Sequence, residues 1–240
     1  MFFFSPSQAA KKLAEIYDSI ANEFSESRNS PWEEAEVLFA ATPKNAKILD
    51  IGCGNGRLVP LFLKKNCEVF GGDISEKLLG IAQKKYPAAH FQKVDFSDLP
   101  FADETFDEVW SVASFHHIPT EKKRLRALSE MCRVLKPKGE VIIIVWNLWN
   151  QQKYARQKRW SILRSFLIPT WSKRDFIIPW GTEKKTRYYH SFDVQELQKL
   201  AEKSGFLVKE LFGWRKGGKE VILHSQNICI RLQKKSSLLC

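Results

Sequence analysis

The sequence predicts an α/β fold whose sheet is mostly parallel and covered by helices on both faces, and three observations support it. From residue 47 to residue 146, apolar runs typical of buried strands alternate with amphipathic helical patterns. The first of these runs ends at Asp50-Ile51 and leads into a glycine loop over residues 52–56, as expected where a strand turns sharply toward a ligand. Asp73 ends the next run, roughly 20 residues later, where doubly wound folds present an acid to a ribose.

Two helices are expected before the sheet, within a helical cap over residues 1–42. Apolar side chains recur at helical spacing over residues 8–24, and a polar turn ends at Pro31-Trp32. A second helix is predicted from about Trp32 to Ala41. The apolar start, residues 1–6, lacks the basic leader and the length of a signal peptide, so we interpret it as a local anchor or a frayed end.

The central region predicts five strands and three helices. The expected strands are 47–51, 67–72, 90–94, 106–112 and 140–146, and the expected helices are 56–65, 75–85 and 121–135. After it, a helix is predicted over 193–204 with Asp193 as its cap, then strands 206–212 and 220–232 joined as a hairpin at Gly217-Gly218. The tail from residue 234 is expected to be disordered.

Residues 147–190 interrupt this rhythm as a basic insert that we expect over the substrate side of a single domain. Basic residues outnumber acidic ones there by ten to two, and tryptophans lie between them. Interleaved cations and aromatic rings suit phosphate contacts and base stacking, although a solvated face over a small helical subdomain would give the same pattern.

Composition narrows the class of protein. The chain has 240 residues, a net charge of +11 and 44% hydrophobic residues, which favours a sizeable core and a polyanionic partner. The sequence contains no run of 18 apolar residues, so it predicts no membrane-spanning helix. The five cysteines are widely spaced, which argues against a disulfide framework or a zinc site and favours small core residues in a reducing cytoplasm.

The glycine loop itself excludes two nucleotide-binding classes. It lacks the Gly-Lys-Ser/Thr ending of a phosphate-cradling loop, and its spacing is Gly-x-Gly-x-Gly, which differs from that of nicotinamide dehydrogenases. Together with Asp73, Val94-Asp95, Phe106-Asp107 and residues 133–137, the loop resembles the motifs of class I S-adenosylmethionine-dependent methyltransferases, in the right order over residues 47–146. That resemblance implies a Rossmann-like, seven-stranded, mostly parallel sheet with a reversed last strand.

The resemblance also implies a binding site for S-adenosyl-L-methionine and assigns its residues. Gly52, Gly54 and Gly56 would line the methionine moiety, Asp73 would take the ribose hydroxyls, and Asp95 with Phe96 would meet the adenine. A helix cap remains the alternative for Asp73, and core packing the alternative for Tyr17, which would otherwise cover the cofactor. The full set of expected cofactor-binding residues is Tyr17, Asp50, Gly52, Cys53, Gly54, Asn55, Gly56, Asp73, Ile74, Asp95, Phe96 and Ser111.

A closer resemblance rests on motifs outside the cofactor loop. Residues 17–28 with Pro31-Trp32, Leu99-Pro100-Phe101, Phe115-His116-His117, Val145-Trp146 and residues 187–192 are similar to the tRNA methyltransferases that esterify 5-carboxymethyluridine at the wobble position. Lys138, and the stretch 147–149, depart from that family's pattern. The resemblance implies the anticodon region of tRNA as substrate, and eukaryotic members of that family work with a small activator subunit.

Methyl transfer to a carboxylate sets modest demands on the protein. The nucleophile is already ionised at neutral pH, since its unperturbed pKa is about 4, so alignment and a cation for the carboxylate suffice. The candidates for this catalytic work are Arg28, His116, His117, Tyr188 and His190. We expect one of the adjacent histidines to face the substrate and the other to be structural; no metal is expected.

Two other functions share the cofactor motifs. A small-molecule methyltransferase, acting for instance on a quinone precursor, would need no strongly basic insert. A non-catalytic scaffold that binds S-adenosylmethionine would not need the complete set of cofactor motifs.

Overall fold

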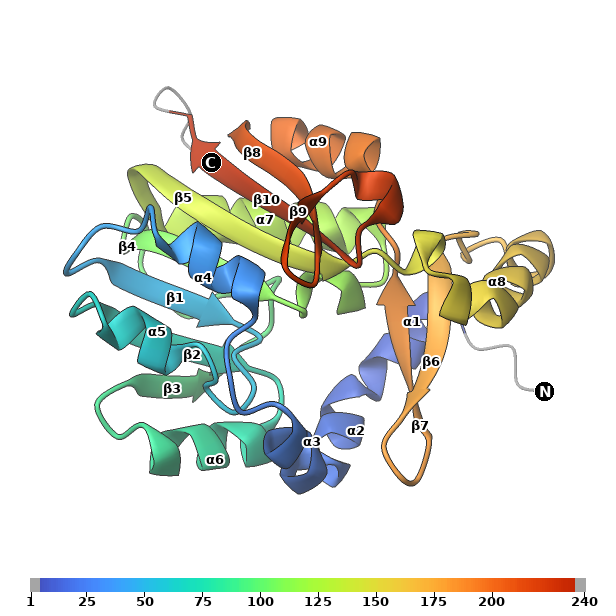
Figure 1. Ribbon diagram of the computed structural model, residues 1–240, viewed down its shortest axis with the longest axis horizontal. Helices are drawn as coiled ribbons and strands as arrows, with labels where there is room; N and C mark the ends of the chain where they lie inside the picture. The colour runs from blue at the N-terminus through green and yellow to red at the C-terminus, as the bar shows by residue number, and fades with distance from the viewer. Residues whose placement is uncertain (1–4, 236–240) are drawn as a thin grey trace.

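The computed structural model describes residues 5–235, without the side chains of residues 9 and 10, and confirms the predicted α/β fold (Figure 1). Within that range, eight strands form one sheet in the order β3-β2-β1-β4-β5-β10-β8-β9. Their bounds are β1 (Lys47–Ile51), β2 (Glu68–Asp73), β3 (His90–Lys93), β4 (Phe106–Val112), β5 (Leu135–Trp146), β8 (Phe206–Arg215), β9 (Gly218–Glu220) and β10 (Asn227–Lys234). Strands β1 to β5 run parallel, and β10 is the reversed strand, antiparallel to both β5 and β8.

The end of the sheet differs in one detail from the prediction. The glycine pair joins β8 to the short strand β9, and η4 (Ile222–His224) separates β9 from β10. The expected seven strands therefore become eight among the described residues. The sequence pattern merged β9 and β10 because the residues between them begin with the apolar run Val221-Ile222-Leu223 and include no proline or glycine.

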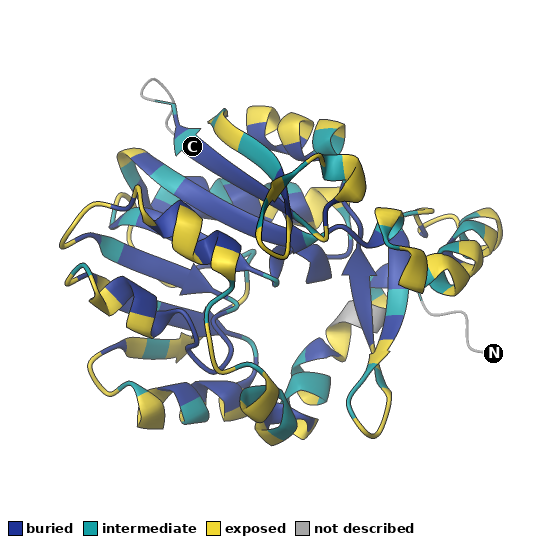
Figure 2. Cartoon of the chain, viewed as in Figure 1, coloured by how far each residue is buried: buried dark blue, intermediate teal, exposed yellow. Residues whose placement is uncertain are grey.

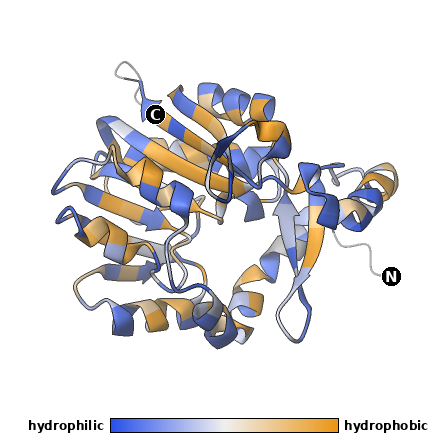
Figure 3. Ribbon diagram, in the orientation of Figure 1, coloured by the Kyte–Doolittle hydropathy of each residue, from blue (hydrophilic) through white to orange (hydrophobic). Residues whose placement is uncertain are grey.

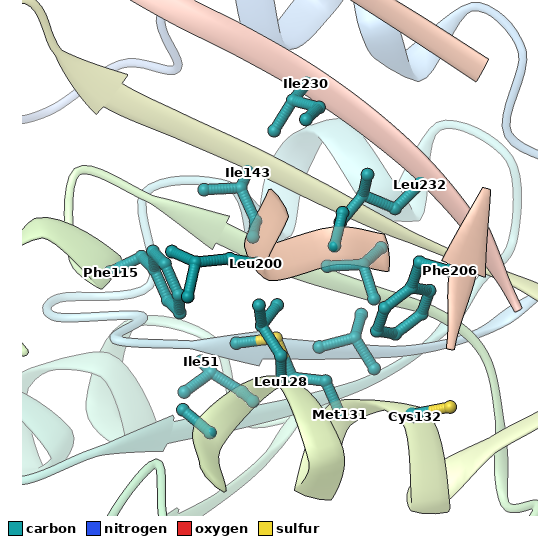
Figure 4. Close-up of a cluster of buried hydrophobic side chains, with 14 of the residues drawn as sticks. Ile51, Phe115, Leu128, Met131, Cys132, Ile143, Leu200, Phe206, Ile230 and Leu232 are labelled. Carbon is teal, nitrogen blue, oxygen red and sulfur yellow. The ribbon is translucent and has the colours of Figure 1, made fainter. Parts of the chain in front are cut away.

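Helices cover both faces of the sheet, and the strand residues alternate between two cores. In β5, Ile143 packs in the core beneath α7 (Glu121–Val134) and α9 (Val194–Lys203), while Ile142 and Ile144 face the core beneath α4 (Glu33–Phe39) and α5 (Val59–Leu63). Figure 4 shows the first core, and Figures 2 and 3 show that the central strands are both buried and apolar. This two-sided burial explains why the strands read as continuous apolar runs.

The remaining predicted helices hold with shifted ends. Helix α6 (Glu76–Lys85) is capped by Ser75, whose Oγ accepts the N–H of Leu78. Asp193 caps α9 as expected, because its carboxylate accepts the N–H of Glu196. None of the helices in the described part of the chain is long and apolar enough to cross a membrane.

The prediction of a single helix over residues 8–24 is wrong. The chain forms three short helices there, α1 (Pro6–Lys11), α2 (Leu13–Ser19) and α3 (Ala21–Ser27), with breaks at Lys12 and Ile20. Ile20 has φ −109° and ψ 9°, outside the helical region, and its side chain is buried. The breaks let the segment curve across the carboxyl edge of the sheet, as Figure 1 shows, and tertiary packing thereby overrides the helical period.

The basic insert folds into elements that the sequence pattern did not resolve. After two short 3-10 turns come α8 (Ala155–Leu167) and a two-stranded sheet of β6 (Asp175–Trp180) and β7 (Lys185–His190), here called the β6–β7 hairpin. Leu148, Phe176, Ile178 and Tyr189 form its small core. At the hairpin tip, the N–H of Thr182 donates to Oε1 of Glu23 in α3 at 3.1 Å, so the insert reaches the N-terminal helices.

The cysteines follow the expectation in part. Cys53, Cys67 and Cys229 are free and buried, as small core residues would be. Cys132 is disulfide-bonded, which the spacing did not predict. The disorder predicted from residue 234 is wrong for Lys234, which is buried in β10. The predictions for residues 1–4 and 236–240 lie outside the described residues.

Candidate active site

A cavity of about 510 Å³ lies at the carboxyl edge of the sheet. The last residues of β1, β2, β4 and β5 line it from one side, which is where open α/β sheets bind ligands. Residues of α2, α3 and β7 line it from the other side, so the three broken N-terminal helices and the hairpin form its outer wall. In Figure 1 this place lies between β1 and β2 on one side and α2, α3 and β7 on the other.

The glycine loop is shaped by positions where a side chain cannot fit. Gly52 has φ +75°, and a Cβ there would lie 2.2 Å from the Cβ of Ser114. Gly54 has φ +55° and meets only a ring atom of Phe24, at 3.4 Å, so its face toward the cavity stays open. Gly56 has φ +74° and does not line the cavity, and a Cβ there would lie 2.9 Å from a ring atom of Tyr86. Its position therefore does not support the expected contact with the methionine moiety.

Asp73 holds this loop in place while facing the cavity. Its Oδ2 accepts the N–H of Gly54 and its Oδ1 accepts the N–H of Ser75, both at 2.9 Å. Burial raises the pKa of Asp73, while these N–H groups favour the carboxylate. The helix cap of α6 is Ser75, so the alternative role of Asp73 as a mere cap does not apply.

The expected cofactor residues divide into two groups. Tyr17, Gly52, Cys53, Gly54, Asn55, Asp73, Ile74, Asp95 and Phe96 all line the cavity. Ser111 does not, because its Oγ pairs with Oγ of Ser114 at 2.8 Å and it is Ser114 that reaches the cavity. The cavity thus offers an open glycine face, a buried carboxylate and apolar walls, and these fit S-adenosylmethionine as the resemblance requires.

Asp50 lies behind the loop, outside the cavity lining. Its Oδ2 is buried and has no hydrogen-bond partner within residues 5–235. Burial raises the pKa of Asp50 to about 7, with Arg57 opposing the shift and Asp73 adding to it. Burial also lowers the pKa of Arg57, which lines the cavity beside Arg28, to about 10.

This shift predicts how the cofactor-free protein responds to pH. The pKa of Asp50 is about 7 in the folded state and about 4 when unfolded, so between these values only the folded chain holds the proton. Asp50 therefore lowers the free energy of unfolding as pH rises through this window. The free energy of unfolding of Asp50→Asn, relative to that of the wild type, is expected to increase with pH up to about pH 7 and to stay constant above it. Urea unfolding from about pH 5 to 8 measures this difference. A difference that does not change with pH would contradict this.

A chain of hydrogen bonds crosses the outer wall of the cavity. Nδ1 of His117 lies 2.7 Å from the carbonyl oxygen of Tyr188, which can only accept, so Nδ1 carries the proton. Nε2 of His117 then accepts from the hydroxyl of Tyr17 at 2.9 Å. The oxygen of Tyr17 in turn accepts from Nη1 of Arg187 at 2.9 Å. The polarity of all three bonds is fixed by the carbonyl at one end and the guanidinium at the other.

Both adjacent histidines line the cavity and both are neutral. Burial and the charge of Arg187 lower the pKa of His117 to about 3. Burial, then His117 and Arg187, lower the pKa of His116 well below its usual value. Nδ1 of His116 accepts the N–H of Trp146 at 3.3 Å, so its proton lies on Nε2. His117 is committed to the hydrogen-bond chain, and the ring of His116 bonds to the backbone of Ala113 and Trp146.

Arg187 is the site residue that the candidate set missed. Its side chain is only 2% exposed, and Nε and Nη2 find no hydrogen-bond partner in the part of the chain that the structure describes. The guanidinium lies 5.1–5.3 Å from the ring centroids of Tyr17, Trp180 and Tyr189, within reach of cation–π attraction. A buried cation that lines a cavity and has unpaired donors favours an anionic ligand there. The sequence could have indicated Arg187, because it is the first residue of the motif at 187–192. It was overlooked because the insert contains many other basic residues.

The other catalytic candidates lie elsewhere. Arg28 lines the cavity, but at the glycine-loop end, where its carbonyl accepts Nδ2 of Asn55 at 3.0 Å. Tyr188 and His190 do not line the cavity, and their side chains bond to Asp175 on the opposite face of the hairpin. Side chains alternate along a strand, so Arg187 and Tyr189 point inward and Tyr188 and His190 point away. The prediction that Tyr188 and His190 contact the substrate is therefore not supported by their positions.

Comparison with known proteins places the chain in a family. The description "Methyltransferase domain" matches residues 49–143. The tRNA (carboxymethyluridine(34)-5-O)-methyltransferase of Schizosaccharomyces pombe is 30% identical over 209 residues, which covers 82% of this chain and 89% of that protein. A protein of the same name from Arabidopsis thaliana is 34% identical over 167 residues, 70% of this chain. The chain spans only 40% of the Arabidopsis protein's length.

Solved structures share the fold. A SAM-dependent methyltransferase from Methanosarcina mazei superposes with a TM-score of 0.70 at 23% identity, over 86% of this chain and 99% of that one. A chain from a complex of the Haloferax volcanii Trm112 methyltransferase activator with a methyltransferase gives 0.67 at 16% identity, over 92% and 97% of the two chains. Because the fission yeast relative is matched along most of its length, this chain belongs to the family of the tRNA (carboxymethyluridine(34)-5-O)-methyltransferases, and S-adenosylmethionine is its methyl donor.

Proposed function

We propose that this chain esterifies the carboxymethyl group of a modified wobble uridine in tRNA. The single observation that carries the proposal is the buried guanidinium of Arg187, a residue that lines the cavity and whose Nε and Nη2 are buried and unpaired among the described residues. A carboxylate is the acceptor that such a fork suits, because two N–H groups can meet one or both of its oxygens. The names of the relatives from fission yeast and Arabidopsis support the same acceptor.

The residues of the cavity act by holding the acceptor. Bound S-adenosylmethionine supplies a methyl group already activated by its sulfonium. Arg187 binds one carboxylate oxygen and leaves the other free to form the new O–C bond, so no proton has to be removed. Neutral His116 and His117 neither take a proton nor compete with Arg187 for the carboxylate. The product ester carries no charge, and its attraction to Arg187 is lost once the transfer is complete.

The cofactor side of the proposal uses the residues that line the glycine loop. Gly52 and Gly54 lie beside the methionine moiety, and the guanidinium groups of Arg28 and Arg57 are at the same end, suited to its carboxylate. Asp73 takes the ribose hydroxyls with its remaining lone pairs. Asp95 and Phe96, which also line the cavity, meet the adenine.

The RNA is held by charge outside the cavity. The chain carries a net charge of +11, and Lys153, Arg156 and Arg159 are exposed on the insert. Counterion release makes such binding weaken steeply with salt. The proposal places the reaction in the cytoplasm, and it includes a small activator subunit because one structural neighbour was solved with a methyltransferase activator.

The test is methylation of tRNA that lacks the ester. The purified chain, with and without an activator subunit, is incubated with S-adenosylmethionine and tRNA from a strain deleted for the corresponding gene, and nucleosides are identified by mass spectrometry. The expected product is the methyl ester of 5-carboxymethyluridine at the wobble position, with Asp73→Ala as the inactive control. Methylation at another nucleoside, or faster turnover of a small carboxylic acid than of tRNA, would overturn the proposal.

The neutral histidines predict the pH dependence of this reaction. The pKa of His117 is about 3 and that of His116 is well below its usual value, so neither titrates near neutrality. The acceptor carboxylate ionises near pH 4. We expect kcat under saturating substrates to be constant from about pH 6 to 8.5. A limb rising through pH 6.5 that persists in Asp50→Asn, whose own carboxyl no longer titrates near pH 7, would show that one histidine takes a proton in the reaction.

A further inference from the structure

The β6–β7 hairpin carries Arg187, yet the main sheet does not hold it. Among residues 5–235 its two strands pair only with each other, and a lone two-stranded hairpin is marginally stable in water. Something else must fix the guanidinium relative to the cofactor. On the cavity side, Nη1 of Arg187 donates to Tyr17 and the ring of Tyr189 stacks on that of Trp146. The tip meets Glu23 through Thr182, and the Tyr188 carbonyl bonds to His117. The remaining contacts are made by the side chains on the far face of β7.

That far face contains a buried cluster of charged groups at the base of the hairpin. Nδ1 of His190 lies 2.7 Å from Oδ1 of Asp175, and its Nε2 lies 2.9 Å from the carboxylate of Glu196 in α9. The hydroxyl of Tyr188 donates to Oδ1 of Asp175 at 2.6 Å. Asp175, Tyr188 and His190 are each 2% exposed or less. We call Asp175, Tyr188, His190, Glu196 and Arg124 the hairpin-base cluster.

Carboxylates link the parts of this cluster. The two ring nitrogens of His190 lie within hydrogen-bond distance of carboxylate oxygens, one of Asp175 and the other of Glu196. Oδ2 of Asp175 also accepts the N–H of Ser172 at 2.8 Å. Nη2 of Arg124 in α7 lies 3.6 Å from Glu196. The cluster thus joins β6 and β7 to α7 and α9.

We propose that the hairpin-base cluster positions Arg187 for the acceptor carboxylate, so that Tyr188 and His190 are positioning residues that act through Arg187 without touching the substrate. This inference rests on the proposed function. The geometry supports it because alternate residues of β7 face opposite sides. Tyr188 and His190 anchor the strand to the main fold on one side. Arg187 and Tyr189 line the cavity on the other. A shift of the anchored side moves the guanidinium by the same amount, since both lie on one extended strand.

A double-mutant cycle separates positioning from general stability. Tyr188→Phe and His190→Gln are each expected to lower kcat/KM for tRNA by about 10- to 100-fold, because small misplacements of a binding group cost that much. The dissociation constant of S-adenosylmethionine is expected to stay within about twofold. In an Arg187→Ala background the same substitutions are expected to change the residual kcat/KM by less than about twofold, because coupled residues are not additive. Full multiplicative losses in that background would overturn the proposal.

Arg174→Gln is the matched control. Arg174 lies at the same base of the hairpin, where its Nη2 pairs with Asp193 at 3.0 Å, but it is outside both the cluster and the cavity lining. Its kinetic constants are expected to remain within about twofold of the wild type. If His190→Gln fails to fold, Tyr188→Phe carries the test, since it removes one oxygen atom. A fully active Tyr188→Phe would overturn the proposal.

A measurement without substrate keeps this inference apart from the proposed function. The Nε–H of Arg187 is buried and gives an NMR resonance that can be assigned from its loss in Arg187→Ala. Tyr188→Phe is expected to shift or broaden it, and Arg174→Gln is expected to leave it unchanged. An unmoved resonance in Tyr188→Phe would refute the positioning role, whereas a wild-type protein that methylates no tRNA would refute the proposed function alone.

Discussion

Arg187→Ala is expected to reduce kcat/KM for the acceptor tRNA by about 100-fold, and more if the pocket does not relax. Removing one partner of a buried, hydrogen-bonded charge pair costs about 2–5 kcal/mol, and 1.4 kcal/mol is about tenfold in rate. The unpaired Nε and Nη2 of Arg187, counted over the described residues, are the donors that this substitution removes. Steady-state kinetics with tRNA lacking the ester, and calorimetry with S-adenosylmethionine, measure the two sides of the site separately.

Two companions to Arg187→Ala define what the loss means. Arg187→Lys keeps the charge but loses the planar fork, so an intermediate rate is expected. Lys185→Ala, two residues away, removes a partly exposed cation that pairs with Glu183, and activity within about twofold of the wild type is expected. If Lys185→Ala were as impaired as Arg187→Ala, the effect would belong to the overall charge of the hairpin, and the assigned carboxylate contact would be wrong.

Gly52→Ala is expected to destabilise the fold and to abolish cofactor binding together. At φ +75° an alanine costs about 1–2 kcal/mol of backbone strain, and a Cβ placed 2.2 Å from that of Ser114 adds an overpacking cost of about 1–3 kcal/mol. Urea unfolding reports the loss of stability, and calorimetry the loss of S-adenosylmethionine binding. Normal cofactor affinity in a folded Gly52→Ala protein would show that the loop does not form the cradle.

Gly80 supplies the control for this substitution. It lies within α6, and apart from its chain neighbours and the surrounding helix backbone no atom lies within 4 Å of where its Cβ would stand. Gly80→Ala is expected to raise the free energy of unfolding by about 0.5–1 kcal/mol, since alanine is the better helix former. The same chemical change thus stabilises one position and disrupts another.

The sequence was most informative where backbone chemistry is local. The strands β1, β4 and β5 read correctly because they are buried on both faces. Asp193 was identifiable because a cap needs only its own helix. Gly52 and Gly54 predicted the loop, because few other residues adopt positive φ. Asp73 could be placed from its spacing alone.

The remainder depended on contacts between distant segments. Arg187 was indistinguishable from the other basic residues of the insert, because its importance comes from burial against Tyr17, which lies 170 positions earlier in the chain. No sequence feature near Ile20 predicts the helix break there, because the break is set by packing in the cavity wall. Tyr188 and His190 belonged to the correct motif, but the pairing that fixes which face of β7 points inward was not visible from composition.

The separation of the β6–β7 hairpin from the main sheet bears on how acceptor choice can change over evolution. The chain leaves the main fold after Trp146 and returns at Ser191, whose Oγ accepts the N–H of Trp149 at 2.9 Å, so the segment starts and ends at one spot. Such a segment can be exchanged as a cassette while the cofactor half stays intact. The match to the general methyltransferase description stops at residue 143, just before this segment. Transplanting residues 147–190 between relatives is therefore the economical route to a new acceptor.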